Sequence, residues 1–208
     1  MEKKVVFDFD ETLVRINSFT YWVFFIWYFS FLKLDFRLFF HLSFLLFKRK
    51  IRKNISHETF KKEIISLELS AVYYEKFSIK LAPYFNQEVK AHLENHLIQQ
   101  DQIVISSGAP EKYLKHFIQQ SYPNTSLLVI GAKIENGRLN DNLKEKKVEN
   151  LIACDFLKKS ERIAILFTDS SHDLALARLA QSIYLISPKD DCRQLFLQEF
   201  GKNIKVIE

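Results

Sequence analysis

Cysteine, glycine and proline are scarce in this sequence of 208 residues. It contains two cysteines, four glycines and four prolines. Cys154 and Cys192 lie too far apart for a metal-binding knuckle or a redox pair, so reduced thiols in a cytosolic protein are the favoured interpretation. The chain also has no internal repeat, no low-complexity segment and no flexible linker. It is long enough to bury one good core, with room for a small accessory domain.

The sequence also lacks a large charge excess and a leader segment. Its net charge of +5 comes from 30 basic and 25 acidic residues, and we expect no nucleic acid partner from so mild a surplus. The basic cluster at residues 48–53 suits a membrane surface or another polyanion, and an ordinary solvated helix end is the alternative. Residues 1–4 lead directly into an apolar stretch, so we expect no signal peptide and a cytoplasmic core.

Two carboxylates follow the first apolar stretch. Residues 5–7 run into Asp8, and Asp10 and Thr12 follow at alternate positions. In a strand this spacing would place both carboxylates on one face, and they would converge where the strand breaks into a loop. A metal ion and a phosphate group are commonly bound by such a pair.

Three further segments with polar residues follow this stretch along the chain. They are Ile103–Ser106 leading into Ser107-Gly108-Ala109-Pro110, the segment opened by Lys147, and Ile163–Phe167 leading into Thr168-Asp169-Ser170-Ser171-His172-Asp173. Strands that alternate with helices indicate an α/β fold with a doubly wound, mostly parallel sheet. Ligands gather at the carboxyl ends of the strands in such a sheet.

The pattern Asp8-x-Asp10-x-Thr12 resembles the first motif of the haloacid dehalogenase-like phosphatases. The three other segments resemble the second, third and fourth motifs of that superfamily, in the same order. The resemblance implies a Rossmann-like core at residues 1–12 and 86–208, with a helical cap inserted at residues 13–85. This is the arrangement of subfamily IB, which includes phosphoserine phosphatase. It also implies Mg²⁺-dependent hydrolysis of a phosphate monoester through an aspartyl-phosphate.

The resemblance also implies a role for each carboxylate of the motifs. Asp8 would be the nucleophile, and Asp10 would act first as the general acid and then as the base. Mg²⁺ would be held by Asp8, the main-chain carbonyl of Asp10 and Asp169. Asp173 would either assist the metal through water or interact with a helix N-terminus.

The resemblance further implies a set of groups that bind the substrate phosphate. This set is Thr12, Ser107, Gly108 and Lys147. Ser106 is the alternative for the serine hydroxyl. Lys144 and Lys146 compete with Lys147, because the glycine that often precedes the motif lysine is missing.

The predicted cap is unusually apolar in its first half. Residues 19–32 and 38–47 are almost uninterrupted apolar runs, and a helix that is apolar all round lies either in a protein core or in lipid. As helices, residues 16–32 and 36–47 would rise only about 25 Å and about 18 Å, against about 30 Å of hydrocarbon. We therefore expect residues 16–53 to lie on or dip into a membrane surface. In the alternative, their aromatic side chains pack on one another and on the amphipathic helical segment at residues 56–85.

The substrate is less sharply indicated than the reaction. Phosphoserine phosphatases carry an acidic residue shortly after the first motif, and residues 15–18 offer none, which disfavours an amino-acid substrate. The aromatic cap followed by basic residues is similar in composition to the phosphatidylglycerophosphate phosphatases. Three hypotheses follow: a lipid-phosphate phosphatase at the cytoplasmic face of a membrane, a soluble small-metabolite phosphatase, and a non-catalytic membrane-associated module. The retained cluster of carboxylates argues against the third.

The remaining local patterns predict further elements of the fold. They are helices at 88–97, 111–120, 144–157 and 173–181, strands at 126–130 and 183–186, and a hairpin turn at Asn136-Gly137. His92 and His96 lie four residues apart without a third metal ligand, so we expect them on the surface.

Overall fold

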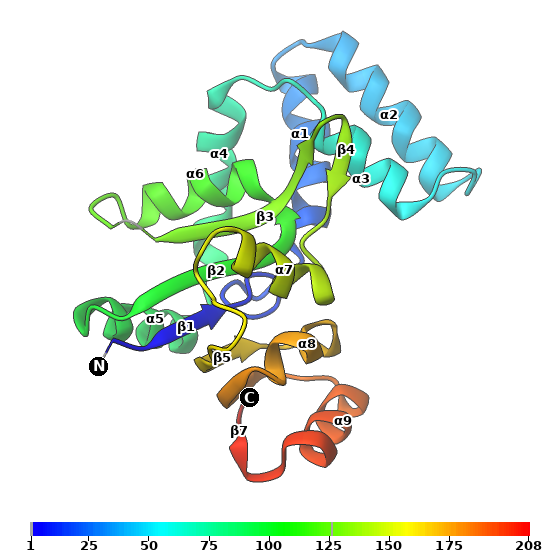
Figure 1. Ribbon diagram of the computed structural model, residues 1–208. Coiled ribbons are helices and arrows are strands. Elements are labelled where there is room, and N and C mark those ends of the chain that lie inside the picture. Colours follow the sequence, from blue (N-terminus) through cyan, green and yellow to red (C-terminus); the bar gives the residue numbers. More distant parts are fainter. Residues whose placement is uncertain (1, 126) are drawn as a thin grey trace.

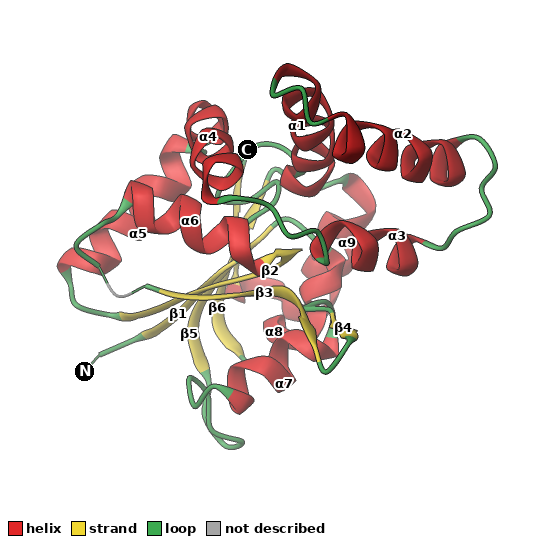
Figure 2. Ribbon diagram, turned by 90° about the horizontal axis from the view of Figure 1, so that it is seen from above, coloured by secondary structure: helices red, strands yellow, loops and turns green. Residues whose placement is uncertain are grey.

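The computed structural model describes residues 2–125 and 127–208, which form a seven-stranded sheet with helices on both faces (Figures 1 and 2). The strands are β1 (Lys4–Phe7), β2 (Gln102–Pro110), β3 (Leu128–Glu135), β4 (Arg138–Asn140), β5 (Ile163–Thr168), β6 (Ala180–Ile186) and β7 (Ile204–Ile207). The helices are α1 (Ser18–Leu32), α2 (Phe36–Lys50), α3 (His57–Ile65), α4 (Ala71–Leu81), α5 (Gln87–Ile98), α6 (Glu111–Ser121), α7 (Glu145–Ala153), α8 (Leu174–Ala177) and α9 (Asp190–Phe200).

The strand order is β4-β3-β2-β1-β5-β6-β7, and every pair is parallel except β3 with β4. This confirms the predicted α/β fold. Strand β1 lies in the middle, where Val6 is in register with Val104 of β2 and with Leu166 of β5. The chain moves outward from β1 to one side and then to the other, so the carboxyl end of β1 is the switch point where ligands bind in such sheets.

Strand β1 is buried on both faces, which explains its unbroken apolar sequence. Val5 and Phe7 join the larger apolar cluster, which extends through α1, α4, α5 and α6. Val6 joins a second cluster with residues of α7, α8 and α9. The two apolar clusters thus pack against opposite faces of β1, and this packing determines where Asp8, the next residue, is placed.

The predicted hairpin is confirmed at Asn136 and Gly137. Both residues have positive φ, 50° and 70°, as a two-residue turn between antiparallel strands requires. Glu135 and Arg138 are paired on either side of the turn.

Several predicted element boundaries were wrong. Helix α7 ends at Ala153 rather than 157. The helix predicted at 173–181 is a 3₁₀ turn at Ser171–Asp173 followed by the short helix α8, because the chain from Ala180 onward pairs with β5 instead. Pairing in a sheet depends on contacts that no local pattern contains. The predicted strand at 126–130 begins at a residue outside the described part of the chain, and β3 continues to Glu135.

The C-terminal helix α9 and strand β7 were not predicted, and the expectation for His96 was wrong. His96 is buried, and its Nδ1 lies 2.8 Å from Asp101 Oδ2. His92 contacts the rings of Phe167 and Tyr184 on the sheet. Both histidines therefore belong to the packing between α5 and the sheet.

Helices α1 to α4 are inserted between β1 and α5, as the motif order predicted, although their division into a separate cap domain stays a prediction. Trp22 of α1 packs against Phe77 of α4 and Tyr113 of α6, with ring centroids 4.8 and 5.3 Å apart. Phe60 and Ile64 of α3 are buried in the same cluster. Part of the aromatic content of the insertion is thus buried in the apolar cluster that it shares with β1, α5 and α6.

Candidate active site

The fold brings the four motif segments to one pocket of about 330 Å³. Seven of the eight predicted site residues line it, and they are Asp8, Asp10, Ser107, Gly108, Lys147, Asp169 and Asp173. The eighth, Thr12, is buried beside it, and its hydroxyl donates to Asp169 Oδ1 over 3.2 Å. Asp8 follows β1 and Asp169 follows β5, and the parallel pairing of these strands places both carboxylates at the same edge of the sheet.

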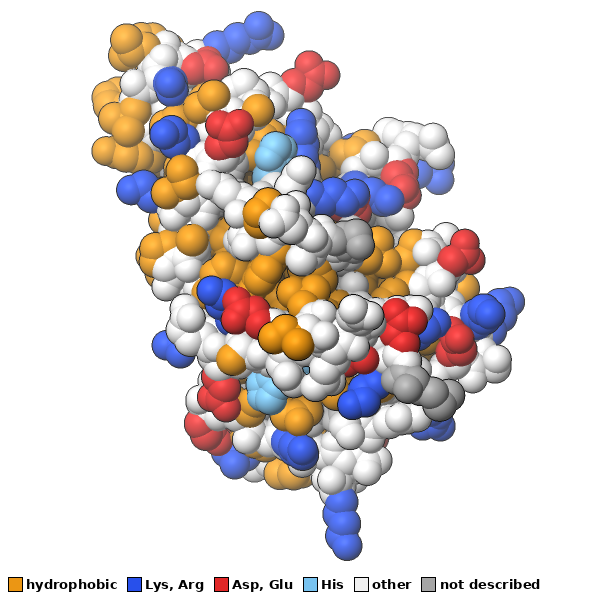
Figure 3. Space-filling view, turned by 90° about the vertical axis from the view of Figure 1, so that its left-hand side faces the viewer, with side chains coloured by type: hydrophobic (Ala, Val, Ile, Leu, Met, Phe, Trp, Pro, Cys, Tyr) orange, Lys and Arg blue, Asp and Glu red, His pale blue; other side chains and the backbone are white. Residues whose placement is uncertain are grey.

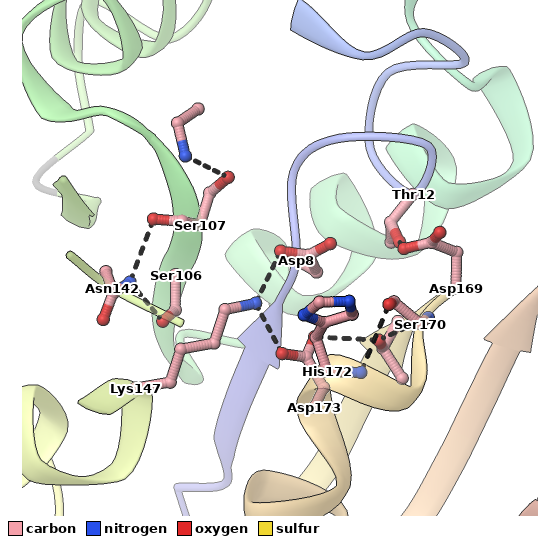
Figure 4. Close-up of polar contacts among 12 residues, drawn as sticks. Asp8, Thr12, Ser106, Ser107, Asn142, Lys147, Asp169, Ser170, His172 and Asp173 are labelled. Carbon is pink, nitrogen blue, oxygen red and sulfur yellow. Dashed lines mark hydrogen bonds and ion pairs between the residues drawn. The ribbon is translucent and has the colours of Figure 1, made fainter. Parts of the chain in front are cut away.

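Lys147 is the central cation of the pocket (Figure 4). Its ammonium donates to Asp8 Oδ1 over 2.7 Å and forms an ion pair with Asp173 Oδ1, also at 2.7 Å. Burial on its own lowers the pKa of Lys147, but attraction to Asp173 and Asp8 outweighs it and the net shift is upward. Of the competing lysines, Lys144 is exposed and Lys146 pairs with a neighbouring glutamate on the surface. Lys147 therefore keeps its charge in the pocket.

The charged forms of the Asp8 and Asp169 carboxyl groups are unfavourable in the pocket. Burial raises the pKa of Asp8 well above its usual value despite Lys147. Burial, together with Glu11 and Asp173, raises the pKa of Asp169 to about 6. A cation bound between the two carboxylates would oppose both shifts.

The donor set suits a hard divalent cation. Carboxylate and carbonyl oxygens are the ligands that Mg²⁺ prefers, with water and phosphate oxygens in the remaining positions. Among residues 2–125 and 127–208, no three acidic, histidine or cysteine side chains come together as a ready-made metal site. Oxygens from the main chain, water or substrate would therefore have to complete the coordination of a cation held by Asp8 and Asp169.

Asp10 is held by the first residue of α1. The Ser18 amide donates to Asp10 Oδ1 over 2.8 Å, and the Ser18 hydroxyl lies 2.7 Å from that of Tyr113. Burial raises the pKa of Asp10 to about 6, although the bonds from Ser18 oppose the shift. A carboxyl group with such a pKa can give up and regain a proton near neutral pH. The role of Ser18 was not predicted, and its place before an apolar run signalled only a helix start.

The end of β2 supplies groups suited to phosphate oxygens. Ser107 lines the pocket, and its Oγ accepts from the Ala109 amide over 3.1 Å. Ser106 instead is bound by the Asn142 side chain, whose amide nitrogen lies 3.0 Å from Ser106 Oγ. A side chain at Gly108 would collide with that of Leu143.

Asn142 holds the end of β2 in position, and this role was not predicted from the sequence. Its amide nitrogen also donates to the main-chain oxygens of Ser107 and Ile130 over 3.1 and 3.2 Å. The Asn150 side chain donates to its oxygen over 2.9 Å. Asn142 thus ties the end of β2 to α7, which carries Lys147. No pattern in the sequence distinguishes it from its polar neighbours.

Asp173 lines the pocket and is also the residue that directly precedes the short helix α8. Its Oδ2 accepts from the Thr168 hydroxyl over 2.8 Å, and Oδ1 faces Lys147. It makes no side-chain bond to the N-terminus of α8. Both of its predicted roles, assistance to a metal through water and interaction with a helix N-terminus, stay predictions. His172 is exposed at the pocket edge.

Solved structures of other proteins share this fold. A structure from Bordetella pertussis Tohama I, of unknown function, is similar with a TM-score of 0.75 and 17% identity, covering 100% of this chain and 99% of its own. A phosphoserine phosphohydrolase-like protein from Francisella tularensis subsp. tularensis SCHU S4 is similar with a TM-score of 0.56 and 16% identity. The match covers 98% of this chain and 94% of the other chain. A substrate-bound phosphoserine phosphatase is similar with a TM-score of 0.54 and 12% identity. The match covers 93% of this chain and 90% of the other chain. At these identities the likeness concerns the fold.

The sequence itself has no match among curated proteins. A family model described as haloacid dehalogenase-like hydrolase matches residues 5–178. This range contains all four motif segments and all eight predicted site residues. Because this family model matches most of the chain, the protein belongs to the haloacid dehalogenase-like hydrolases, the family that its motifs predicted.

Proposed function

We propose that the protein is a Mg²⁺-dependent phosphatase that hydrolyses a phosphate monoester through an aspartyl-phosphate on Asp8. The observation that carries this proposal is the buried Lys147 ammonium, which lies 2.7 Å from both Asp8 and Asp173 in the pocket. Clustered buried charges are costly unless they are used or paired. Their place at the switch point of the sheet supports a catalytic use, and argues against a non-catalytic module.

In the proposed reaction, an oxygen of Asp8 attacks phosphorus and the bond to the ester oxygen breaks. The protonated Asp10 carboxyl gives its proton to the leaving oxygen. Asp10 then accepts a proton from water, the water oxygen attacks phosphorus, and the bond to Asp8 breaks to release inorganic phosphate. The pKa of Asp10, raised to about 6, suits both proton transfers.

The remaining residues bind and orient the phosphate. Ser107 and the Gly108 amide would donate to its oxygens, and Lys147 would offset the charge that accumulates with the nucleophile. Mg²⁺, held by Asp8, Asp169 and the main-chain carbonyl of Asp10, would neutralise the repulsion between carboxylates and phosphate. Asp173 keeps Lys147 in place from the opposite side.

The direct test is hydrolysis of a panel of phosphate monoesters with and without metal. We expect chelation to reduce turnover to background and added Mg²⁺ to restore it. Asp169→Asn should raise the Mg²⁺ concentration needed for half-maximal turnover by about tenfold or more, because it removes a charged ligand. Asp190→Asn, an exposed change in α9, is the control. Full activity after chelation would contradict the metal requirement.

A lipid phosphate is the finer substrate proposal, and the outer face of α2 supports it. Phe36, Phe40, Phe44, Phe47 and Ile51 are all exposed, Phe40 at 66%. Spacings of four, four, three and four residues place these side chains on one face of the helix. On α1, Phe24, Tyr28, Phe31 and Leu32 are exposed with the same periodicity. Figure 3 shows hydrophobic side chains among basic ones on the upper part of the molecule, where Figure 1 places α1 and α2.

The charges around this face match an anionic membrane surface. Residues 16–53 contain seven lysine and arginine residues and a single acidic residue, Asp35, which caps α2. Lys48 lies 4.3 Å from the ring centroid of Phe44, so basic groups border the aromatic face. No helix of the described chain combines the length and the apolar character needed to cross a membrane. The pattern suits a helix that lies in the plane of the interface.

Flotation with vesicles tests this part of the proposal. We expect the protein to float with vesicles that contain anionic lipid, and the double variant Phe40→Ser with Phe44→Ser to lose at least about tenfold in binding, because each buried Phe contributes about 1.5 to 3 kcal/mol. Ile98→Ser is the matched control, because Ile98 is 81% exposed on α5, outside this face. A wild-type protein that stays unbound would favour the soluble small-metabolite phosphatase.

A further inference from the structure

The helical insertion forms one part of the pocket wall, and this part differs in charge from the rest. The acidic lining residues, Asp8, Asp10, Glu11, Asp169 and Asp173, all come from β1, β5 and the segments that follow them. The insertion contributes Asn17, Phe19, Thr20, His57 and Lys61. Its part of the wall is therefore neutral or positive.

Lys61 is the most buried charged group of the insertion. The residue is 3% exposed and lines the pocket, and its ammonium lies 2.5 Å from Asp141 Oδ1. Asp141 belongs to the segment between β4 and α7, and its side chain is 27% exposed. An ammonium has three hydrogen-bond donors. Among the described residues, the Lys61 ammonium donates one side-chain hydrogen bond, to Asp141 Oδ1. Donors therefore remain for a ligand in the pocket.

His57 does not add a second full charge to this wall. Desolvation lowers the pKa of His57, and the positive charges of Lys61 and Arg49 lower it further. The imidazole is therefore largely neutral at neutral pH. The other cation of the pocket, Lys147, is already shared between Asp8 and Asp173. Lys61 is thus left as the charge that can select a feature of the substrate outside its reacting phosphate.

We propose that Lys61 binds a second anionic group on the alcohol part of the substrate. The preferred substrates are then phosphate monoesters that also carry a phosphate, a phosphodiester or a carboxylate. The inference rests on the proposed function and names the substrate class of that site. A pocket of about 330 Å³ is near the lower limit for ligand sites, so a few carbon atoms separate the two anions. A substrate ammonium in this position is repelled by Lys61.

The test compares substrates that differ only in the second anion. In solution, the pair is the bisphosphate of 1,3-propanediol and propyl phosphate. In vesicles, the pair is phosphatidylglycerol phosphate, which has a phosphodiester next to its monoester, and phosphatidic acid, which has the monoester alone. For each pair, the measured quantity is kcat/KM of the substrate with the second anion divided by kcat/KM of the substrate without it. We expect this ratio to be at least about ten.

Three variants separate anion binding from a structural role of the ion pair with Asp141. Lys61→Met keeps the length of the side chain and removes the charge, and it should lower the ratio by roughly tenfold to a hundredfold. Lys61→Arg should restore most of it. Asp141→Asn removes the charge of the partner but keeps the cation, so the ratio should be retained.

Each outcome decides the proposal. A lower ratio in one pair alone supports it and identifies the source of the ligand as lipid or free metabolite. Two results would overturn it. One is that Lys61→Met and Asp141→Asn lower kcat/KM equally for both substrates of each pair. The other is that the wild-type protein shows no preference in either pair. If no ester is hydrolysed at all, the proposed function fails separately. Calorimetry of Asp8→Asn with propane-1,3-diphosphonate and propylphosphonate, with and without Lys61→Met, then decides the role of Lys61.

Discussion

Replacement of Asp8 by asparagine is expected to reduce turnover to background on every phosphate monoester, by about ten-thousandfold or more. The amide has nearly the shape of the carboxylate but cannot serve as the nucleophile. The fold should persist, because Lys147 keeps its ion pair with Asp173. Burial raises the pKa of Asp8, so its charge is unfavourable where it lies, and the variant should unfold at no lower temperature than the wild type.

Steady-state turnover and thermal unfolding, measured on the same preparations, check this expectation. Asp155→Asn is the matched control, because Asp155 is exposed and its positive φ of 59° is a conformation that asparagine also tolerates. It should retain wild-type turnover. Retention of more than a few per cent of turnover by Asp8→Asn would mean that another group is the nucleophile.

Replacement of Asp10 by asparagine should have the second largest effect, and its size should depend on the leaving group. Asp10 is proposed to protonate the leaving oxygen, so an alkyl phosphate should lose about a hundredfold to ten-thousandfold in kcat/KM. An aryl phosphate such as p-nitrophenyl phosphate needs little protonation and should lose far less. The amide of asparagine can still accept the bond from the Ser18 amide, so the loop should keep its conformation.

The measurement is a plot of log kcat/KM against the pKa of the leaving alcohol for wild type and variant. The slope should become steeper in Asp10→Asn. Glu11→Gln serves as the control, because Glu11 also lines the pocket but has no proposed proton transfer. It removes the same charge and should leave the slope unaltered. Equal losses on alkyl and aryl esters in Asp10→Asn would argue against an acid role.

The class of sheet and the meeting of the motifs could be predicted because both follow from local patterns. The apolar runs before Asp8, Ser107 and Asp169 indicate buried strands, and parallel strands end at one edge of a sheet. Pattern and spacing therefore placed these residues in one pocket. The turn at Asn136 and Gly137 followed in the same way from the conformations that these residues adopt.

The roles of single polar residues depended on the folded chain. Lys144 has a positive φ just before α7 and is exposed. Lys147 lies in the first turn of α7, is buried and forms ion pairs with two carboxylates. The contacts of Asn142 and Lys61 join segments that are tens of residues apart. Such partners are selected by packing, and no spacing along the chain encodes them.

The family, the class of fold and seven of the residues that line the pocket could be predicted from the amino-acid sequence. The division of the insertion's aromatic residues between buried and exposed positions became evident from the folded chain. In a run that is apolar throughout, period alone cannot assign a face, because every face is equally apolar. Packing against α4 and α6 buries Trp22, while Phe40 of α2 lies on the outer face and is exposed.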